Sequence, residues 1–255
     1  MRRLVGLVEP WLLIVLLVAG WEIACRALHT PDYFLPPPSH VAQALAANFP
    51  VLIAAAWRTL SVAIVALALA SGLAQALAVA GALSRTFDRG VHPIASVIQV
   101  TPVVAIAPLF LIWAGLDHPG RALVALAMLV AFFPIYSGAA AGLRAADPDL
   151  ERLFDLYGAS AWQRVLRLKL PSAVPFVLEG HKVAAGLAIV GAVVAEFVAG
   201  SGNVRGLAWQ ILDAGNKLQT ARMIAALVVL GVMGVALHRA LETLERAALK
   251  WWRGR

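Results

Sequence analysis

The chain has 255 residues, of which 61% are hydrophobic and only 14% are charged. Because soluble domains carry roughly 25% charged residues, this composition excludes an ordinary soluble protein and predicts a multi-pass α-helical membrane protein. The basic residues behind the net charge of +7 are spread over loops and ends, which is typical of membrane topology rather than of nucleic-acid binding. A single cysteine, Cys25, excludes an internal disulfide framework.

Six apolar segments approach or exceed the length of about 20 residues that a helix needs to cross a bilayer. They are Pro10–Leu28, Leu60–Leu83, Val91–Leu116, Ala122–Leu143, Val183–Ala199 and Met223–His238. The first follows two arginines as in a signal peptide, but no small-x-small cleavage site follows it, so we expect it to be retained. The last two are short, so we expect Lys182 and Arg222 beside them to extend their charged groups to the interface.

The segment between the first two spans, Thr30–Pro50, contains two different signals. Pro36-Pro37-Pro38 predicts an extended stretch, and Ser39–Asn48 predicts a short interfacial helix. The sequence contains no internal repeat and no polar second half. Residues 1–255 are therefore predicted to form a single transmembrane domain.

The distribution of lysine and arginine predicts the orientation in the membrane. Fifteen of the 21 basic residues lie at the two termini and in the second and fourth loops, and six lie on the other side. The positive-inside rule then places both termini and the fourth loop in the cytoplasm, which agrees with an even number of spans.

The fourth loop contains a polar, basic segment, Asp147–Pro175, between the apolar spans. Asp147 is a favourable helix N-cap, and Pro148 suits the first helical position. Gly158 can adopt the left-handed conformation that ends a helix. These residues predict a short helix that ends in a glycine corner.

A second short helix is predicted directly after this corner. Ser160 and Gln163 have the spacing of a capping box, and Pro171 is expected to limit the helix that they start. The segment also carries apolar residues that we expect to be exposed, namely Leu153, Phe154 and Trp162. Such a pair of helices fits a groove on a soluble partner, and the alternative is a basic loop that only lies on the lipid surface.

This segment resembles the cytoplasmic EAA loop of importer-type ABC transporter permeases. The family pattern is Glu-Ala-Ala, three residues, Gly, nine residues and Ile-x-Leu-Pro. Here Gly158 and Leu168-Lys169-Leu170-Pro171 have that spacing, with Leu in place of Ile. Arg152-Leu153-Phe154 occupy the Glu-Ala-Ala positions, although Glu151 is adjacent. The EAA-type loop covers about residues 144–182.

Three further motifs resemble the permease subfamily for aliphatic sulfonates, taurine and nitrate. They are Leu35-Pro36-Pro37-Pro38 followed by Val41; Thr101-Pro102 followed by the run from Ala107 to Gly115; and Ala195-Glu196 followed by Gly200 and Gly206-Leu207. Because the motifs occur in order over nearly the whole chain, the resemblance extends beyond the loop.

The resemblance implies an all-α permease of the type I ABC importer fold in the bacterial inner membrane, with both termini cytoplasmic. It implies a cytoplasmic ABC ATPase dimer, an external solute-binding protein and a second permease copy as partners, with no cofactor, metal or nucleic acid. The solute that the resemblance implies is a small anion such as an alkylsulfonate, taurine or nitrate. The residues expected to couple the chain to the ATPase are Asp155, Gly158, Ala159, Ser160, Trp162, Leu168 and Pro171.

Polar residues inside the spans are candidates for the translocation path. Gln99, Thr101 and Pro102 lie in the third span, where Pro102 and Pro108 should bend the helix. Two interpretations of this bend remain: a kink that serves packing, and a helix that lines the pore. For Gln75, a hydrogen bond between helices is a better interpretation than a position lining the pore. Glu196 lies near the outer end of the fifth span. Two roles remain for it: one in the translocation path and one at the membrane interface.

Two other functions compete with transport driven by a partner ATPase. A membrane-embedded enzyme would need a nucleophile and base, or clustered acids and histidines, on facing spans, and the sequence does not show them. The six histidines are scattered without the spacing of metal ligands. A passive channel would explain the polar span residues but not the cytoplasmic helix pair. The chain has no Walker phosphate loop, so we expect ATP hydrolysis to reside in a partner.

Overall fold

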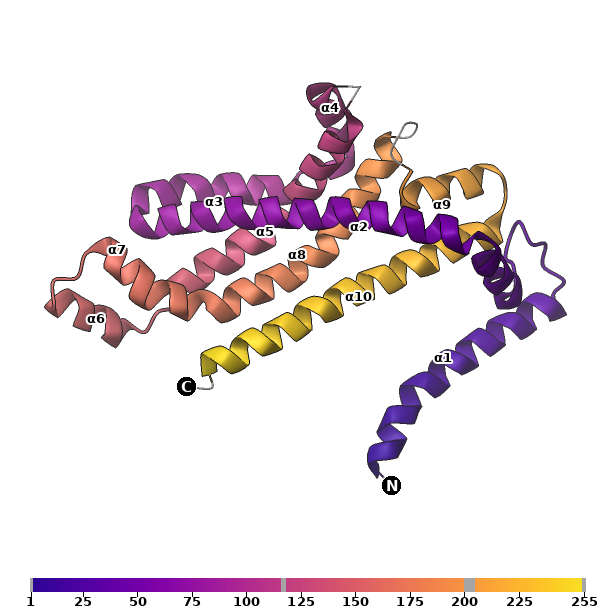
Figure 1. Ribbon diagram of the computed structural model, residues 1–255, viewed down its shortest axis with the longest axis horizontal. Helices are drawn as coiled ribbons and strands as arrows, with labels where there is room; N and C mark the ends of the chain where they lie inside the picture. The colour runs from indigo at the N-terminus through magenta and orange to yellow at the C-terminus, as the bar shows by residue number, and fades with distance from the viewer. Residues whose placement is uncertain (1, 116–117, 200–204, 254–255) are drawn as a thin grey trace. The chain divides into compact units, whose positions relative to one another are not determined.

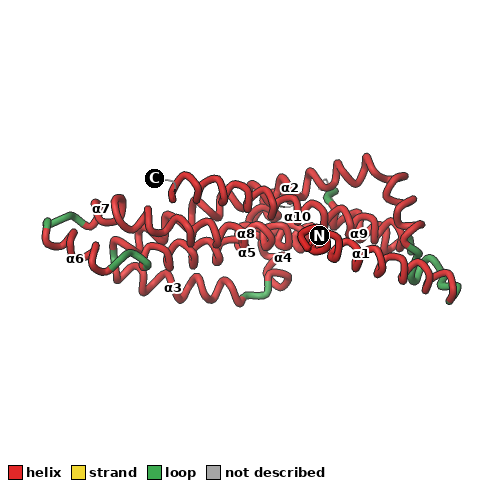
Figure 2. The backbone as a smooth tube through the Cα atoms, turned by 90° about the horizontal axis from the view of Figure 1, so that it is seen from below, coloured by secondary structure: helices red, strands yellow, loops and turns green. Residues whose placement is uncertain are grey.

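The computed structural model describes the backbone of residues 2–115, 118–199 and 205–253, and the side chains of residues 12–115, 118–199 and 205–250. Helices joined by short loops make up this part of the chain, and it contains no strand (Figure 2). The elements are α1 (Arg2–Ala27), α2 (Pro38–Leu83), α3 (Arg85–Val100), α4 (Val103–Ala114), α5 (Pro119–Arg144), α6 (Pro148–Leu156), α7 (Ala161–Arg164), the π-helical segment η1 (Val165–Lys169), α8 (Leu170–Ala199), α9 (Leu207–Asn216) and α10 (Thr220–Arg253). The predicted all-α fold class is confirmed.

Four stretches of helix in the described residues are long and apolar enough to cross a membrane. They are Pro38–Leu83, Pro119–Arg144, Ala161–Ala199 and Thr220–Lys250. The pair α3 and α4 would make a fifth if it counts as one broken span. The first predicted span falls in α1, whose described side chains begin at Leu12 and which is not among these. The predicted six spans are thus matched by four or five in the described part of the chain.

The interfacial helix predicted for Ser39–Asn48 is not a separate element. It is the first part of α2, which begins at Pro38 and continues through Pro50 for 46 residues. Pro38 suits the start of a helix because it needs no N–H donor there. Pro50 removes only one hydrogen bond from a long helix, and one bond is too little to end it.

The predicted third span is broken rather than merely bent. The axes of α3 and α4 differ by 104° across the break at Thr101 and Pro102. Thr101 is extended, with φ −70° and ψ 124°, because the ring of the following proline disfavours helical backbone in the preceding residue. Pro108, by contrast, lies inside α4 without ending it.

The fifth and sixth predicted spans are longer than the apolar pattern indicates. The helix of the fifth begins at Ala161, and that of the sixth extends from Thr220 to Lys250. Lys182 therefore does not need to reach an interface. Its ammonium group instead pairs with Glu179 at 2.5 Å on α8 and with Glu245 at 2.9 Å on α10. Arg222 likewise hydrogen-bonds within the protein, to Gln210 at 2.8 Å.

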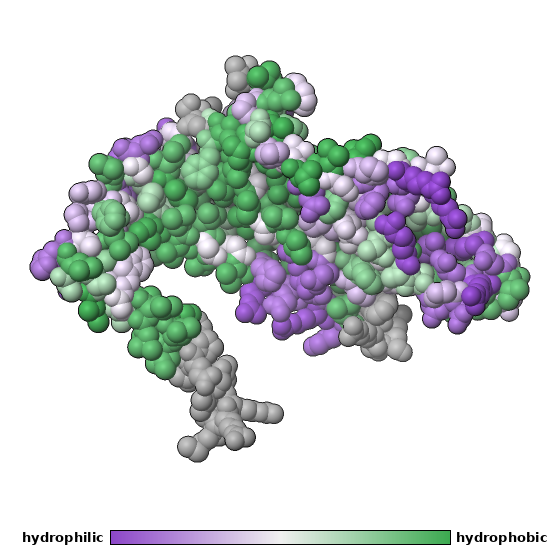
Figure 3. All heavy atoms as spheres, turned by 180° about the vertical axis from the view of Figure 1, so that it is seen from behind, coloured by the Kyte–Doolittle hydropathy of each residue, from purple (hydrophilic) through white to green (hydrophobic). Residues whose placement is uncertain are grey.

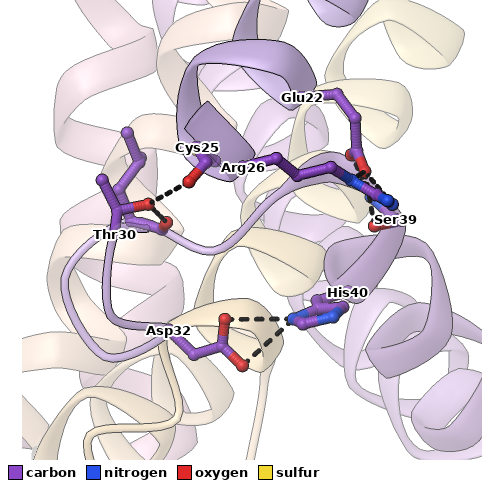
Figure 4. Close-up of polar contacts among 8 residues, drawn as sticks. Glu22, Cys25, Arg26, Thr30, Asp32, Ser39 and His40 are labelled. Atoms are coloured by element: carbon purple, nitrogen blue, oxygen red, sulfur yellow. Dashed lines mark hydrogen bonds and ion pairs between the residues drawn. The ribbon is translucent and has the colours of Figure 1, made fainter. Parts of the chain in front are cut away.

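The chain divides into two compact units. Unit 1 contains residues 1–56 and 205–231, and unit 2 contains residues 57–204 and 232–255. In unit 1 the side chains of Leu52, Leu207, Ala208 and Ala225 are fully buried. The Glu22 carboxylate of α1 accepts hydrogen bonds from the Ser39 backbone N–H at 3.0 Å and the Ser39 hydroxyl at 2.9 Å, which joins α1 to the first turn of α2 (Figure 4).

Unit 2 is built around the pair α5 and α8, which lie side by side (Figure 1). Glycines let their backbones meet: a Cβ added at Gly138 would lie 2.7 Å from the Phe176 carbonyl oxygen, and one at Gly180 would lie 2.7 Å from the Pro134 carbonyl oxygen. Gly142 and Gly191 make equally close approaches to backbone of the facing helix. In a bilayer, where lipid is as apolar as a side chain, such packing is a main source of association between helices.

Gly180→Ala should destabilise the protein by about 1–3 kcal/mol, because the added methyl group would force the α5 and α8 backbones apart. The measurement is the denaturant or thermal unfolding midpoint of the purified protein in lipid nanodiscs. Gly186→Ala, also on α8, is the matched control, because a Cβ there meets nothing within 4 Å. Equal midpoints for the two variants would contradict close backbone contact at Gly180.

Candidate functional site

The segment between α5 and α8 folds as two short helices around a glycine corner, and we call residues 147–169 the knuckle. Its first helix, α6, begins as the sequence predicts: the Asp147 carboxylate accepts a hydrogen bond from the Asp149 N–H at 2.8 Å, and Pro148 occupies the first turn. Asp149 and Glu151 also place negative charge in that turn, where the positive end of the helix dipole favours it.

The corner at Gly158 is a Schellman motif. The Gly158 N–H donates to the Asp155 carbonyl at 3.0 Å, and the Ala159 N–H donates to the Phe154 carbonyl at 3.0 Å. Gly158 has φ +62°, a left-handed conformation that costs a residue with a side chain roughly 1–2 kcal/mol. The predicted role of this glycine as the corner is confirmed by its geometry.

The second helix begins with the predicted capping box. The Gln163 N–H donates to Ser160 Oγ at 3.3 Å, and the Ser160 N–H donates to Gln163 Oε1 at 2.8 Å. The prediction that Pro171 limits this helix is wrong. After α7 the chain widens into the π-helical segment η1, in which the Leu170 N–H donates to the Val165 carbonyl, and it continues as α8. Pro171 has no N–H to donate to the helix. The π-helical turn before it pairs N–H and carbonyl groups five residues apart instead of four.

Three ion pairs hold the knuckle together. Arg164 of α7 pairs with Asp155 of α6, and Lys169 of η1 pairs with Glu151 of α6 at 3.1 Å. The Arg164 Nε also donates to the Ala159 carbonyl at 3.1 Å. The third pair, Arg152–Asp149 at 3.2 Å, lies within α6. The first two connect the helices on either side of the corner, so they limit its opening.

The knuckle exposes an apolar surface, part of which the sequence analysis missed. Leu153 and Trp162 are exposed as predicted, whereas Phe154 is half-buried. Leu156 and Tyr157 are exposed far more, at 85% and 83%. Leu156 follows Leu153 by three residues, and this helical spacing is the signal that would have identified it. Between the helices lies a hollow of about 290 Å³, lined by Leu153, Phe154, Tyr157, Ala159, Gln163 and Arg167.

The predicted coupling residues do not all reach this surface. Asp155, Ser160, Trp162 and Pro171 are exposed, whereas Leu168 is buried, with 6% of its surface exposed. Leu168 therefore supports the knuckle from within. Hydrophilic side chains gather at the end of unit 2 that carries α6 and α7, in contrast to the apolar surface of its helices (Figure 3).

The polar span residues fall in three different settings. Gln75 belongs to a chain of hydrogen bonds: its Nε2 donates to Ser71 Oγ at 2.6 Å, Ser71 Oγ lies 2.8 Å from His181 Nε2, and His181 Nδ1 lies 2.7 Å from the Val177 carbonyl. The Ser71–His181 contact connects α2 to α8, whereas Gln75 itself bonds to a residue of its own helix. The sequence analysis missed His181 as the partner of Ser71.

The other two settings are the break between α3 and α4 and the outer part of α8. Thr101 Oγ1 donates to the Val97 carbonyl at 2.8 Å, in addition to the Thr101 backbone N–H at 3.1 Å; Gln99 and Pro102 beside it are exposed. An apolar hollow of about 420 Å³ lies between α2, α3, α4 and α5, but Gln99, Thr101 and Pro102 do not line it.

Glu196 is buried, with 3% of its surface exposed, and accepts a hydrogen bond of 2.7 Å from the fully buried Thr59 of α2. A carboxylate in this position bonds to the protein rather than to the membrane interface. Gly200 of its predicted motif lies outside the described residues, whereas Gly206 is the N-cap residue of α9 and Leu207 is fully buried.

Comparison with known proteins gives the family. Residues 72–250 match the model of the binding-protein-dependent transport system inner membrane component. The chain belongs to this family. It is similar to the riboflavin transport system permease protein RibX of Chloroflexus aurantiacus (31% identity, 93% of this chain and 88% of the relative) and to the taurine transport system permease protein TauC of Escherichia coli (30%, 94% and 87%). The formylaminopyrimidine transport permease protein ThiX of Halalkalibacterium halodurans is 29% identical over 98% of both chains.

A solved structure supports the same fold. The crystal structure of an amino acid ABC transporter with histidines superposes with a TM-score of 0.63 and 16% identity, covering 80% of this chain and 96% of that one. The chain is therefore a permease subunit of a binding-protein-dependent ABC importer, a multi-pass protein of the inner membrane. It is not an enzyme, since ATP hydrolysis in this family belongs to a partner ATPase.

The departure from the family loop pattern has a structural counterpart in this permease. Arg152, which occupies the Glu position, is largely exposed and pairs with Asp149 of its own helix. The adjacent Glu151 instead forms the pair with Lys169 that ties α6 to η1. The acid beside the motif thus braces the knuckle.

Ser160→Ala should destabilise the start of α7 by about 1 kcal/mol, because the Gln163 N–H loses its acceptor. Amide hydrogen exchange at Gln163 should accelerate roughly fivefold, while global unfolding stays close to that of the parent. Ser61→Ala is the control, because Ser61 Oγ only donates to the Arg58 carbonyl within α2 and caps no helix. Unchanged exchange at Gln163 in the Ser160 variant would show that the capping box contributes nothing.

Proposed function

We propose that the knuckle is the surface through which the partner ATPase drives this permease. The supporting observation is a helix–Gly158–helix corner, capped on both helices, braced by two ion pairs and exposing Leu156, Tyr157 and Trp162. A small rigid element with protruding apolar groups fits a groove on a protein partner. Asp155, Gly158, Ala159 and Ser160 shape the corner, Trp162 contacts the ATPase, and Leu168 and Pro171 connect the corner to α8.

Transport in this proposal follows from rigid-body motion. When the ATPases close on ATP, the knuckle moves with them, and α5 and α8 carry that motion into the bilayer. A homodimer would place the path at the interface between two copies, since the apolar helices of one chain form a small bundle. Gln75, Gln99, Thr101, Pro102 and Glu196 are the candidates for the path. Residues 1–255 would act as a single permease domain, with its loop at about 144–182 facing the ATPase.

The solute is proposed to be a small anion of the aliphatic sulfonate, taurine or nitrate type. The similarity to the taurine permease TauC supports this class, and so does the similarity to the putative aliphatic sulfonates permease SsuC of Escherichia coli, which is 29% identical over 96% of this chain. An external solute-binding protein would deliver the solute.

The proposal requires the knuckle to face the cytoplasm together with both termini. A Ser160→Cys variant in a background in which Cys25 is replaced by serine should react with a membrane-impermeant maleimide only in inside-out vesicles. The excess of basic residues in this loop and at the termini supports that orientation. Labelling in right-side-out vesicles would contradict both the orientation and the contact with the ATPase.

Gly158→Val tests the coupling role directly. A Cβ at this position meets no neighbour, so the substitution acts only through the left-handed backbone, which a β-branched residue disfavours. The protein should insert normally, while uptake driven by ATP and the loaded binding protein should fall by about tenfold or more.

Gly90→Ala of α3 is the control, because it also adds a side chain in open space but lies in ordinary helical backbone. Its uptake should equal that of the parent. Full uptake by the Gly158→Val protein would refute the proposal that the corner transmits the motion of the ATPase.

A further inference from the structure

Unit 1 contains an open cavity of about 410 Å³ with a mixed polar and apolar lining. Its lining comes from three segments: Asp32 of the loop before α2, Ala44 and Asn48 of α2, and the run from Leu218 to Arg222 that leads into α10. The Thr220 hydroxyl donates to the Tyr33 carbonyl at 2.6 Å, which ties the first segment to the third. This volume lies within the range of sites that bind small molecules.

The lining of the cavity includes one acidic and one basic side chain, Asp32 and Arg222. The Asp32 carboxylate, 63% exposed, has both oxygens 3.0 Å from His40 Nδ1 (Figure 4). Each carboxylate oxygen can accept more than one hydrogen bond, so this carboxylate keeps free acceptor capacity. His40 lies one helical turn before Ala44 on α2 and therefore shares its face.

Arg222 is the basic side chain of this lining. Its Nη2 donates to Gln210 Oε1 at 2.8 Å, and its Nη1 donates to Gln219 Oε1 at 3.3 Å and lies 3.8 Å from Asp213. The side chain keeps 21% of its surface exposed, which leaves part of it accessible from the cavity. Asp213 does not cancel the local positive charge, because it also pairs with Lys217 at 2.8 Å. The hydrogen bond from Lys217, together with the charges of Arg222 and Arg205, holds the pKa of Asp213 below its usual value.

The rim of the cavity carries local backbone strain. The Leu218 N–H donates to the Gly215 carbonyl and the Gln219 N–H donates to the Ala214 carbonyl, so α9 ends in a Schellman motif. Leu218 occupies the left-handed position of this motif with φ 55°, a conformation that glycine adopts without steric cost. Its side chain is 69% exposed. Strain of this kind clusters at functional sites.

We propose that this cavity binds a small zwitterionic solute, with the acidic group of the solute at Arg222 and its ammonium group at Asp32. Asn48 and Gln219 also line the cavity, and each side-chain amide has one group, Asn48 Oδ1 and Gln219 Nε2, besides the one that bonds to Ala44 or to Arg222. The proposal deepens the transport function proposed above and rests on it for the solute being cargo. It selects amino-sulfonates and similar zwitterions over nitrate, because nitrate offers nothing to Asp32.

The test is calorimetric binding to the full-length permease in nanodiscs without its partners. The probes share a two-carbon frame: taurine carries both charges, ethanesulfonate only the anion and ethylamine only the cation. Taurine should bind about tenfold more tightly than either, because each end adds a charge-assisted hydrogen bond. Equal affinities of the three probes, or no saturable binding of any, would overturn the proposal.

Variants assign the two ends. Asp32→Asn should reduce taurine to the affinity of ethanesulfonate, and Arg222→Gln should abolish binding of both. Ala44→Met fills the cavity without removing a polar group, so it should also abolish binding even if the Arg222 variant folds poorly. Arg26→Gln is the matched control, because its guanidinium pairs with Glu22 in the same unit and does not line the cavity. Binding that survives Ala44→Met would place the solute elsewhere.

The two proposals fail separately. If the permease binds taurine but a reconstituted system with ATPase and binding protein does not import it, the cavity stands and taurine transport fails. If that system imports sulfonates with equal rates in parent and Ala44→Met protein, transport stands and the cavity plays no part in it.

Discussion

The direct backbone contact between α5 and α8 is the constraint on which the rest of unit 2 depends. Gly138, Gly142, Gly180 and Gly191 remove the side chains that would otherwise separate the two helices. The knuckle is the connection between these same helices, leaving from the end of α5 at Arg144 and returning into α8. Both of its ends are therefore held by one packed pair, and a displacement of the knuckle must move that pair as a body. Polar contacts alone would leave such a loop free to bend.

The knuckle adds its own stiffness to this arrangement. Its two helices are short, and isolated helices of such length are unstable in water because nucleation is costly. Caps at Asp147 and Ser160 satisfy the exposed N–H groups, the Schellman motif satisfies the carbonyls at the end of α6, and ion pairs close the corner. The result is an element that is held in one shape by local bonds while Leu156 and Tyr157 stay exposed on its surface. That combination is what transmission of force requires.

Polar side chains also lie within the apolar helices of this permease, at a few well-defined places. The Gln75–Ser71–His181 chain and the Thr59–Glu196 bond both connect α2 to α8. Each side chain there has a hydrogen-bond partner, Gln75 on its own helix and the others on the facing helix, since an unsatisfied polar group in the bilayer costs several kcal/mol. At the break between α3 and α4, the Val97 carbonyl accepts both the Thr101 backbone N–H and the Thr101 hydroxyl, which fixes the last turn of α3.

The sequence by itself determined the features that depend on residues within about four positions of one another. The apolar runs predicted an all-helical membrane protein, and the residue order predicted the N-cap at Asp147, the corner at Gly158 and the capping box at Ser160, since each rests on local backbone hydrogen bonds. Only the tertiary structure decided that the chain passes Pro171 through a π-helical turn, that Leu168 is buried and that Ser71 meets His181, 110 residues away. Those outcomes depend on how closely helices approach, and this approach is set by packing between residues that no local pattern connects.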